Sequence, residues 1–297
     1  MDNLIHNIKI RIRSHKKVRL SRSISGNIGV FIFLLLICAF MILPMLYAFI
    51  NAFKPLDELF LYPPRFFVRN PTWQNFSDAF ALTESLDVPF LRYAFNSLFI
   101  TFVGTAIYTV LAAAAGYSLG KGDFKGKSLL SSLVVWALLF RPEVTSIPRY
   151  IIVSSLGMVN TYWALILPAL ASTMGVFLIR QFVVVAIPDA TLEAARIDGA
   201  SEYKIFFRIV IPGIKPALMT SIIFTFQSMW NSADNTQFIY NENLKSLPNV
   251  LSTIATGGIA RAGAAAAVSV ILMIPPIIVF LVSQSSVMET MTHSGLK

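Results

Sequence analysis

The sequence predicts an all-α, polytopic membrane protein with six transmembrane helices. Three observations support this fold class: the apolar composition, the length of the apolar runs, and the placement of basic residues on alternate connections. Of the 297 residues, 56% are hydrophobic and only 13% are charged, whereas soluble domains carry about 25% charged residues. Much of the chain therefore needs an apolar solvent, and a helix of about 20 apolar residues is long enough to cross a bilayer.

Six apolar runs are candidates for these helices. They are Gly26–Phe53, Tyr93–Leu119, Ser128–Phe140 continuing toward Ile152, Tyr162–Ile179, Ile209–Trp230 and Ala264–Val287. The third run is interrupted by Arg141, Pro142 and Glu143, so a short third helix followed by a surface helix remains an alternative. An even number of spans agrees better with the charge pattern.

Basic residues gather on alternate connections, which is the pattern of cytoplasmic segments in the positive-inside rule. The N-terminal arm, residues 1–25, is strongly basic, and so are the second and fourth connections. The first connection, about Lys54–Arg92, contains more acids than bases, and the fifth, Asn231–Arg261, is poor in cations. We therefore expect a cytoplasmic basic arm, a transmembrane domain over residues 26–297, and both termini in the cytoplasm.

The first connection is rich in aromatic and turn residues, which favours a position along the membrane interface. Docking of an external partner and simple anchoring explain this composition equally well. Small residues at Ala112–Gly116 and Gly263–Ala267 predict close helix contacts. The adjacent prolines Pro275 and Pro276 remove backbone donors and predict a kink in the last helix.

Several function classes find no support in the residues. The net charge of +9 follows from orientation, with contact to anionic lipid as a further option, and no soluble basic face is long enough for nucleic acid. Cys38 is the single cysteine and the three histidines lie near the termini, so no metal site and no catalytic set is predicted. The stretch Gly122–Ser128 resembles a phosphate-binding loop, but it has three residues between its glycines where that motif needs four. It is predicted to be a tight cytoplasmic turn.

Ionisable residues are scarce in the central parts of the predicted helices. Proton relays and ion pathways in membranes are marked by such residues, so a proton-coupled carrier is disfavoured and the energy source should lie outside this chain. A self-sufficient secondary transporter or channel remains the alternative, and uptake by the purified chain without ATP would favour it. A membrane-embedded enzyme is a third class, which a bound metal or a covalent intermediate would support.

The fourth connection, about residues 184–212, predicts two helices joined by a corner. Asp189 can cap the first helix through its carboxylate, and Gly199 suits the left-handed position that ends it. Ser201 can cap the second helix, with Glu202 favourable at its positive end, and Pro212 can bend the chain where it re-enters the membrane. The expected result is a short, rigid helix, Ala190–Asp198, outside the bilayer, able to transmit a movement.

At this connection the sequence resembles the permease subunits of ATP-binding-cassette (ABC) importers. Their signature is Glu-Ala-Ala, three residues, Gly, nine residues, Ile, one residue, a branched aliphatic residue and Pro. This chain matches it with one variation, Ile211 where Leu is common, at Glu193, Ala194, Ala195, Gly199, Ile209 and Pro212. Asn160–Pro168, Gly175–Phe182 and the Asn96-Ser-Leu stretch are similar to the carbohydrate branch, including the second maltose-permease subunit. The segment from Gly257 to Met291 resembles subunits that import plant or algal oligosaccharides.

The resemblance implies a type I importer permease in the cytoplasmic membrane of a bacterium, which translocates a carbohydrate by alternating access. It implies as partners a second permease chain, two ATPase subunits that dock against the coupling helix of this loop, and an extracytoplasmic solute-binding protein. ATP and Mg²⁺ would be bound by the ATPase, so this chain is expected to hold no cofactor and to catalyse no reaction.

Polar and aromatic residues near the end of the fifth apolar run are candidates for the substrate path. Gln227, Trp230 and Asn231 combine an aromatic face with amide groups, which sugars commonly contact. Two alternatives stay open: Trp230 can be an interfacial residue, and Gln227 can join two helices by a hydrogen bond. In related importers the main sugar site can also lie on the partner permease.

Overall fold

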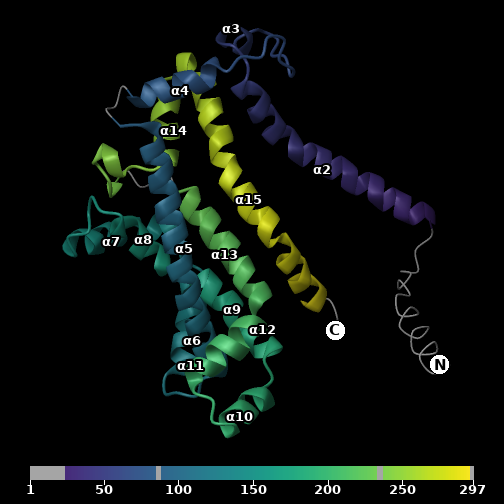
Figure 1. Cartoon of the computed structure of the whole chain (residues 1–297), viewed down its shortest axis with the longest axis vertical. Coiled ribbons are helices and arrows are strands. Elements are labelled where there is room, and N and C mark those ends of the chain that lie inside the picture. Colours follow the sequence, from purple (N-terminus) through teal and green to yellow (C-terminus); the bar gives the residue numbers. More distant parts are fainter. Residues whose placement is uncertain (1–23, 85–87, 233–236, 295–297) are drawn as a thin grey trace, which may run out of the picture. The chain divides into compact units, whose positions relative to one another are not determined.

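The computed structural model describes residues 24–84, 88–232 and 237–294, and in these ranges the chain is built from helices and turns (Figure 1). The first part contains α2 (Ile24–Ala52), α3 (Leu56–Leu59), α4 (Gln74–Glu84), α5 (Phe90–Lys121), α6 (Lys127–Ala137), α7 (Pro142–Ser155), α8 (Trp163–Leu170) and α9 (Thr173–Ala186). The second part contains α10 (Asp189–Ile197), α11 (Glu202–Ile205), the π-helix η1 (Phe206–Val210), α12 (Ile211–Gly213), α13 (Lys215–Trp230), the short 3₁₀ helices η3 (Glu242–Leu244) and η4 (Ile259–Arg261), α14 (Leu247–Ala255) and α15 (Ala262–Ser294). The predicted all-α class is confirmed for these residues.

The chain divides into two units, Met1–Ala48 and Phe49–Lys297. The described part of the first unit is a single helix, most of α2. Residues 1–23 of the predicted basic arm lie outside the described residues. In the second unit α5 packs against α8, α9 and α13, and α15 packs against α4, α13 and α14. The candidate functional loop is part of this second unit.

Four helices of the described chain are long and apolar enough to span a membrane: Gly26–Ala52, Phe90–Lys121, Trp163–Ala186 and Ala262–Gln284. They correspond to the first, second, fourth and sixth predicted spans. A fifth is reached if the bent pair Glu202–Gly213 and Lys215–Trp230 counts as one span. The structure therefore supports four or five spans and does not confirm the predicted six.

The third predicted run does not form one continuous helix. Its apolar part is α6, which has 11 residues, or about 16 Å of helix at 1.5 Å per residue. Arg141 is extended (φ −75°, ψ 145°) and Pro142 begins α7, since a residue before proline is disfavoured in the helical conformation. The alternative of a short helix followed by a second one describes this region better than one long span.

The small residues of α5 allow the close helix contact that their sequence predicts. A Cβ atom on Gly116 would lie 2.6 Å from Cγ2 of Ile179 and 3.1 Å from the backbone nitrogen of Arg180 on α9. On α15, a Cβ atom on Gly263 would lie 2.2 Å from Oδ1 of Asn75 on α4. At Gly116 a side chain would meet the backbone of α9 and push the two helices apart, whereas at Gly263 it would displace the Asn75 side chain. The adjacent prolines of α15 lie inside a helix that continues through them to Ser294.

The stretch Asn96-Ser97 of α5 fixes the connection between α13 and α14. Asn96 is fully buried; its amide donates to the carbonyl oxygens of Asn243 and Lys245, and its Oδ1 accepts from the Tyr162 hydroxyl. The Ser97 hydroxyl accepts from the backbone N–H of Leu247 at 2.7 Å. These polar groups have partners inside an apolar bundle, where an unpaired group would cost free energy.

Candidate functional site: the loop between α9 and α13

The loop from α10 to α12 rests on the largest buried apolar cluster of the second unit. Leu192 of α10, Ile205 of α11, Val210 of η1 and Ile214 are each at most 2% exposed. They pack with residues of α5, α9 and α13 in one cluster. Burial of each aliphatic side chain stabilises the arrangement by about 1.5–3 kcal/mol. The loop is therefore an ordered extension of the helical bundle, at the end opposite α4 and α14 (Figure 1).

Helical spacing gives α10 an inner and an outer face. Leu192 points into the cluster and Ala195 packs against it, whereas Glu193, Ala194 and Ile197 are exposed. Ile197 is 86% exposed although it is large and apolar. Sequence reasoning did not select Ile197; its position four residues after Glu193, on the same helix face, was the available signal.

The corner after α10 is a Schellman motif. The backbone N–H of Gly199 donates to the carbonyl of Arg196, and that of Ala200 donates to the carbonyl of Ala195, each at 3.0 Å. Gly199 has φ +74°, the left-handed conformation that glycine adopts without a side-chain penalty. The predicted left-handed conformation of Gly199 at the end of this helix is confirmed. Ala195 and Ala200 both contact the buried cluster, which is the apolar contact that usually accompanies this motif.

The predicted cap by Asp189 is wrong. Pro188 occupies the N-cap position with φ −65° and ψ 139°, and no side chain caps the helix there. Asp189 is the first helical residue, and its carboxylate instead pairs with the ammonium group of Lys121 on α5 at 2.8 Å. The acid still lies at the positive end of the α10 dipole, where it is favourable.

The second helix begins as the sequence predicts and then departs from the prediction. Ser201 is the N-cap and accepts from the N–H of Lys204 at 3.4 Å. Ile209 lies in the π-helix η1 and is half-buried, and Pro212 is exposed within α12. The axis turns by 80° between Gly213 and Lys215. The predicted bend is therefore present, but it follows Pro212, and Ile209 precedes it instead of starting the fifth span.

The residues proposed for the substrate path differ in accessibility. Trp230 is 3% exposed, stacks on Phe226 at 5.9 Å and donates from Nε1 to the carbonyl of Leu272 on α15 at 2.9 Å. It joins α13 to α15, and its side chain is not open to a substrate in this arrangement. Gln227 and Asn231 are exposed, so only these two present polar surface.

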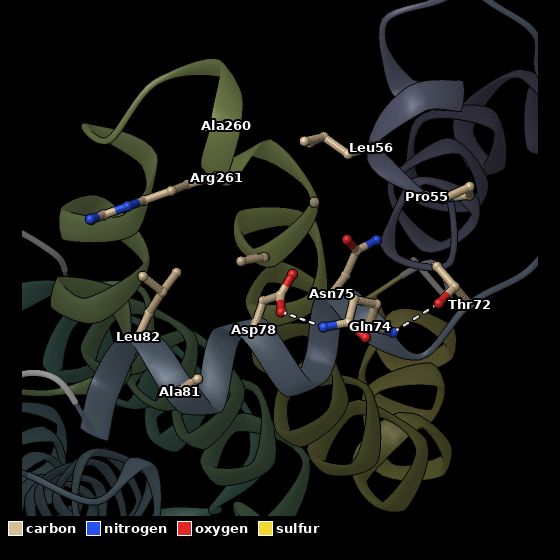
Figure 2. A pocket seen from close by; sticks show the side chains of 12 residues that line it. Pro55, Leu56, Thr72, Gln74, Asn75, Asp78, Ala81, Leu82, Ala260 and Arg261 are labelled. Carbon is tan, nitrogen blue, oxygen red and sulfur yellow. Dashed lines mark hydrogen bonds between the residues drawn. The ribbon is translucent and has the colours of Figure 1, made fainter.

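A cavity of about 570 Å³ lies at the opposite end of the second unit, between the segment 55–82 and the start of α15 (Figure 2). Its polar lining includes Asp78, whose carboxylate accepts from the amide of Gln74 at 2.8 Å, and Arg261. Asn75 holds α4 in place, since its amide donates to the carbonyls of Ala52 and Lys54. The cavity is separate from the loop between α9 and α13.

The stretch that resembles a phosphate-binding loop forms a turn between α5 and α6. The ammonium group of Lys127 donates to the carbonyl oxygens of Gly120 and Gly122 at 3.3 and 2.8 Å. These carbonyls lie at the C-terminal end of α5, where a cation is favourable. The lysine is thus used to close the helix end, in agreement with the predicted tight turn.

Comparisons with known proteins place the chain among transport proteins. No family model matches it. It is 31% identical over 275 residues to the probable ABC transporter permease protein YurM of Bacillus subtilis (strain 168), covering 92% of this chain and 89% of that protein. It is 32% identical over 214 residues to the polygalacturonan/rhamnogalacturonan transport system permease protein YtcP of the same organism, covering 72% of each.

A solved structure is similar in fold. The chain superposes with a TM-score of 0.74 and 21% identity on a chain from the crystal structure of a bacterial ABC transporter involved in the import of the acidic polysaccharide alginate. The match covers 90% of this chain and 99% of the other. At this level of identity the similarity establishes the fold of the helical bundle.

Proposed function

This chain belongs to the permease family of ABC transporters, and we propose that it is a membrane-spanning subunit of an importer for oligosaccharides. The alignment with the Bacillus subtilis permease over 92% of the chain is the observation that carries this proposal. The carbohydrate class is supported by the relative that transports polygalacturonan and rhamnogalacturonan. The alternative of a self-sufficient secondary transporter is set aside, because the relatives are ABC permeases.

The exposed face of α10 is the proposed contact for the ATPase subunits. Glu193 offers a carboxylate, Ala194 leaves room for close approach, and Ile197 offers an apolar side chain to a groove. An exposed aliphatic side chain outside the bilayer gains free energy when a partner covers it. Tyr203 and Phe207, 81% and 58% exposed, extend this apolar surface beyond the corner. ATP and Mg²⁺ belong to the partner in this proposal.

The proposed orientation places α10 in the cytoplasm and α4 with its neighbouring cavity outside the cell. It is supported by the basic residues of the connections between α5 and α6 and around α10, which favour the cytoplasmic side. A solute-binding protein would then deliver the oligosaccharide to the end of the molecule that carries α4. A second permease chain would complete the pathway, and ATP-driven movement of α10 would switch access between the two sides.

The test is oligosaccharide uptake in lipid vesicles by the purified complex with its partner permease, ATPases and binding protein. We expect uptake that requires ATP, and a loss of at least about tenfold in Glu193→Ala, as expected when a buried polar partner is left unpaired at an interface. Asp123→Ala is the matched control, because Asp123 is an exposed acid on the turn between α5 and α6, outside the proposed contact face of α10. Uptake without ATP, or equal uptake by both variants and the parent, would contradict the proposal.

A further inference from the structure

Three polar side chains from different segments meet at the corner between α10 and α11. One Glu202 carboxylate oxygen accepts from Nε of Arg196 at 2.8 Å, and the other accepts from the hydroxyl of Tyr117 at 3.1 Å. Arg196 belongs to α10, Glu202 begins α11, and Tyr117 lies near the end of α5. A single carboxylate thus joins the two helices of the corner to a long helix of the bundle.

A second bridge joins the other end of α10 to the same helix. Lys121 of α5 pairs with Asp189, the first residue of α10, at 2.8 Å. Lys121 and Tyr117 are four residues apart on α5 and therefore lie on one face, one turn apart. Between them the two bridges hold the beginning of α10 and its end. Leu192 is buried in the apolar cluster and anchors the inner face of α10, and the two bridges add directed polar contacts between α10 and its neighbours at both of its ends.

We propose that Tyr117, Glu202 and Arg196, together with the Lys121–Asp189 pair, are positioning residues that transmit movement of α10 to α5. This proposal rests on the proposed function of α10 as the contact for the ATPase. The residues lie on the inner side and the flank of the corner, while Glu193 and Ile197 face outward. α5 packs against α8, α9 and α13, so a movement that reaches α5 reaches the helices that carry the pathway.

The expected effect of breaking the network on transport follows from how exposed its side chains are. Arg196 and Glu202 have side chains that are 46% and 59% exposed, and exposed ion pairs change an equilibrium by a factor of about five at most. Loss of the network should therefore loosen the corner without unfolding it. The expected signature is a lower ratio of oligosaccharide transported to ATP hydrolysed, with ATP hydrolysis itself retained.

The first experiment measures this ratio in the reconstituted complex for Tyr117→Phe and Glu202→Gln. Tyr117→Phe removes only the hydroxyl and keeps the ring contact with Phe206 at 6.0 Å. We expect a decrease of about twofold to fivefold in transport per ATP, with Tyr150→Phe and Asp123→Asn as matched controls at the parent value. If both corner variants retain the parent ratio while Glu193→Ala loses uptake, the positioning role is refuted and the proposed function stands.

Charge exchange tests the second bridge. Lys121→Glu and Asp189→Lys should each lower transport per ATP, and the double variant should restore part of it. Where Lys121→Glu fails to assemble, Asp189→Asn breaks the same pair at a side chain that is 74% exposed. If the double variant transports no more oligosaccharide per ATP than the single variants, the proposal is contradicted.

A distance measurement tests the bridge without any transport assay. Spin labels at Ser118 and Ala190, both exposed, in the full chain with Cys38→Ser report the spread of α10 relative to α5. We expect a narrow distance distribution in the parent and a broader one in Asp189→Asn, which breaks the pair next to both labels. An unchanged width overturns the proposal even if the chain proves to have another function.

Discussion

Gly199 shows how a residue of the family signature acts through backbone conformation. Its φ of +74° closes the Schellman motif, and no atom lies within 4 Å of a Cβ built at this position. A side chain would therefore meet open space, and the cost of replacement is purely conformational. The same motif explains Ala195, whose carbonyl accepts the second bond of the turn.

Replacement of Gly199 should show whether the corner depends on the left-handed backbone conformation of this residue. Gly199→Ala is expected to destabilise the corner by about 1–2 kcal/mol, the cost of a left-handed residue with a Cβ atom. Gly199→Asn should cost less, because asparagine visits this conformation more readily. Amide hydrogen exchange of Ala200 and Gly199 in the purified chain measures the difference. Equal protection in both variants would show that the turn does not depend on the left-handed conformation.

The hydrogen bonds of Glu58, in α3, predict that the local stability of the segment after α3 depends on pH. Its carboxylate accepts hydrogen bonds from the backbone N–H groups of Arg69 and Asn70 at 3.0 and 2.9 Å. The bond from Arg69 is the main cause that holds the pKa of Glu58 below its usual value of 4.5, with Asn70, Lys54 and Arg65 adding to it against the opposing effect of burial.

A depressed carboxylate pKa contributes stability at neutral pH that is lost as the pH falls through the folded-state value. We expect the amides of Arg69 and Asn70 to be protected from exchange at pH 7 and to lose protection on acidification below 4.5. Glu58→Gln should weaken protection at pH 7 and remove its pH dependence. Protection that is independent of pH in the parent chain would contradict the role given to Glu58.

At the scale of helices, the sequence predicted local chemistry well and tertiary placement poorly. The corner at Gly199 and the Ser201 cap depend on residues within one helical turn of each other, so the local sequence is sufficient to predict both. Asp189 was misassigned because its partner, Lys121, is 68 positions away. The Tyr117–Glu202 bond joins residues 85 positions apart, and the burial of Trp230 depends on α15. None of these contacts is encoded in local spacing.

The crossing of α5 and α9 gives a sharp test of helix packing. Gly116→Ala places a Cβ atom 2.6 Å from Cγ2 of Ile179, and such overpacking costs about 1–3 kcal/mol. The thermal midpoint of the purified chain should fall, while Ala114→Leu at an exposed position of α5 should leave it nearly unchanged. Ile179→Leu removes the nearest methyl group and should recover part of the loss. An unchanged midpoint in Gly116→Ala would refute the close crossing.

At the scale of the whole molecule, the described helices support fewer spans than the six that the sequence predicts. Composition predicted a membrane protein, and four described helices are long enough to cross a bilayer, with a fifth if the bent pair is one span. The run around Arg141 was too ambiguous because apolar content alone does not tell a span from two short helices. The helices form a bundle, and the ordered loop at one end presents the exposed face of α10, which is the proposed contact for a partner.

Cross-linking in the purified complex tests most directly whether the outer face of α10 meets the ATPase, as proposed. A photoreactive residue at Ala194 is compared with one at Ala81, an exposed alanine on α4. We expect an adduct with the ATPase from Ala194 and none from Ala81. No ATPase adduct from Ala194, or equal adducts from both positions, would contradict the account.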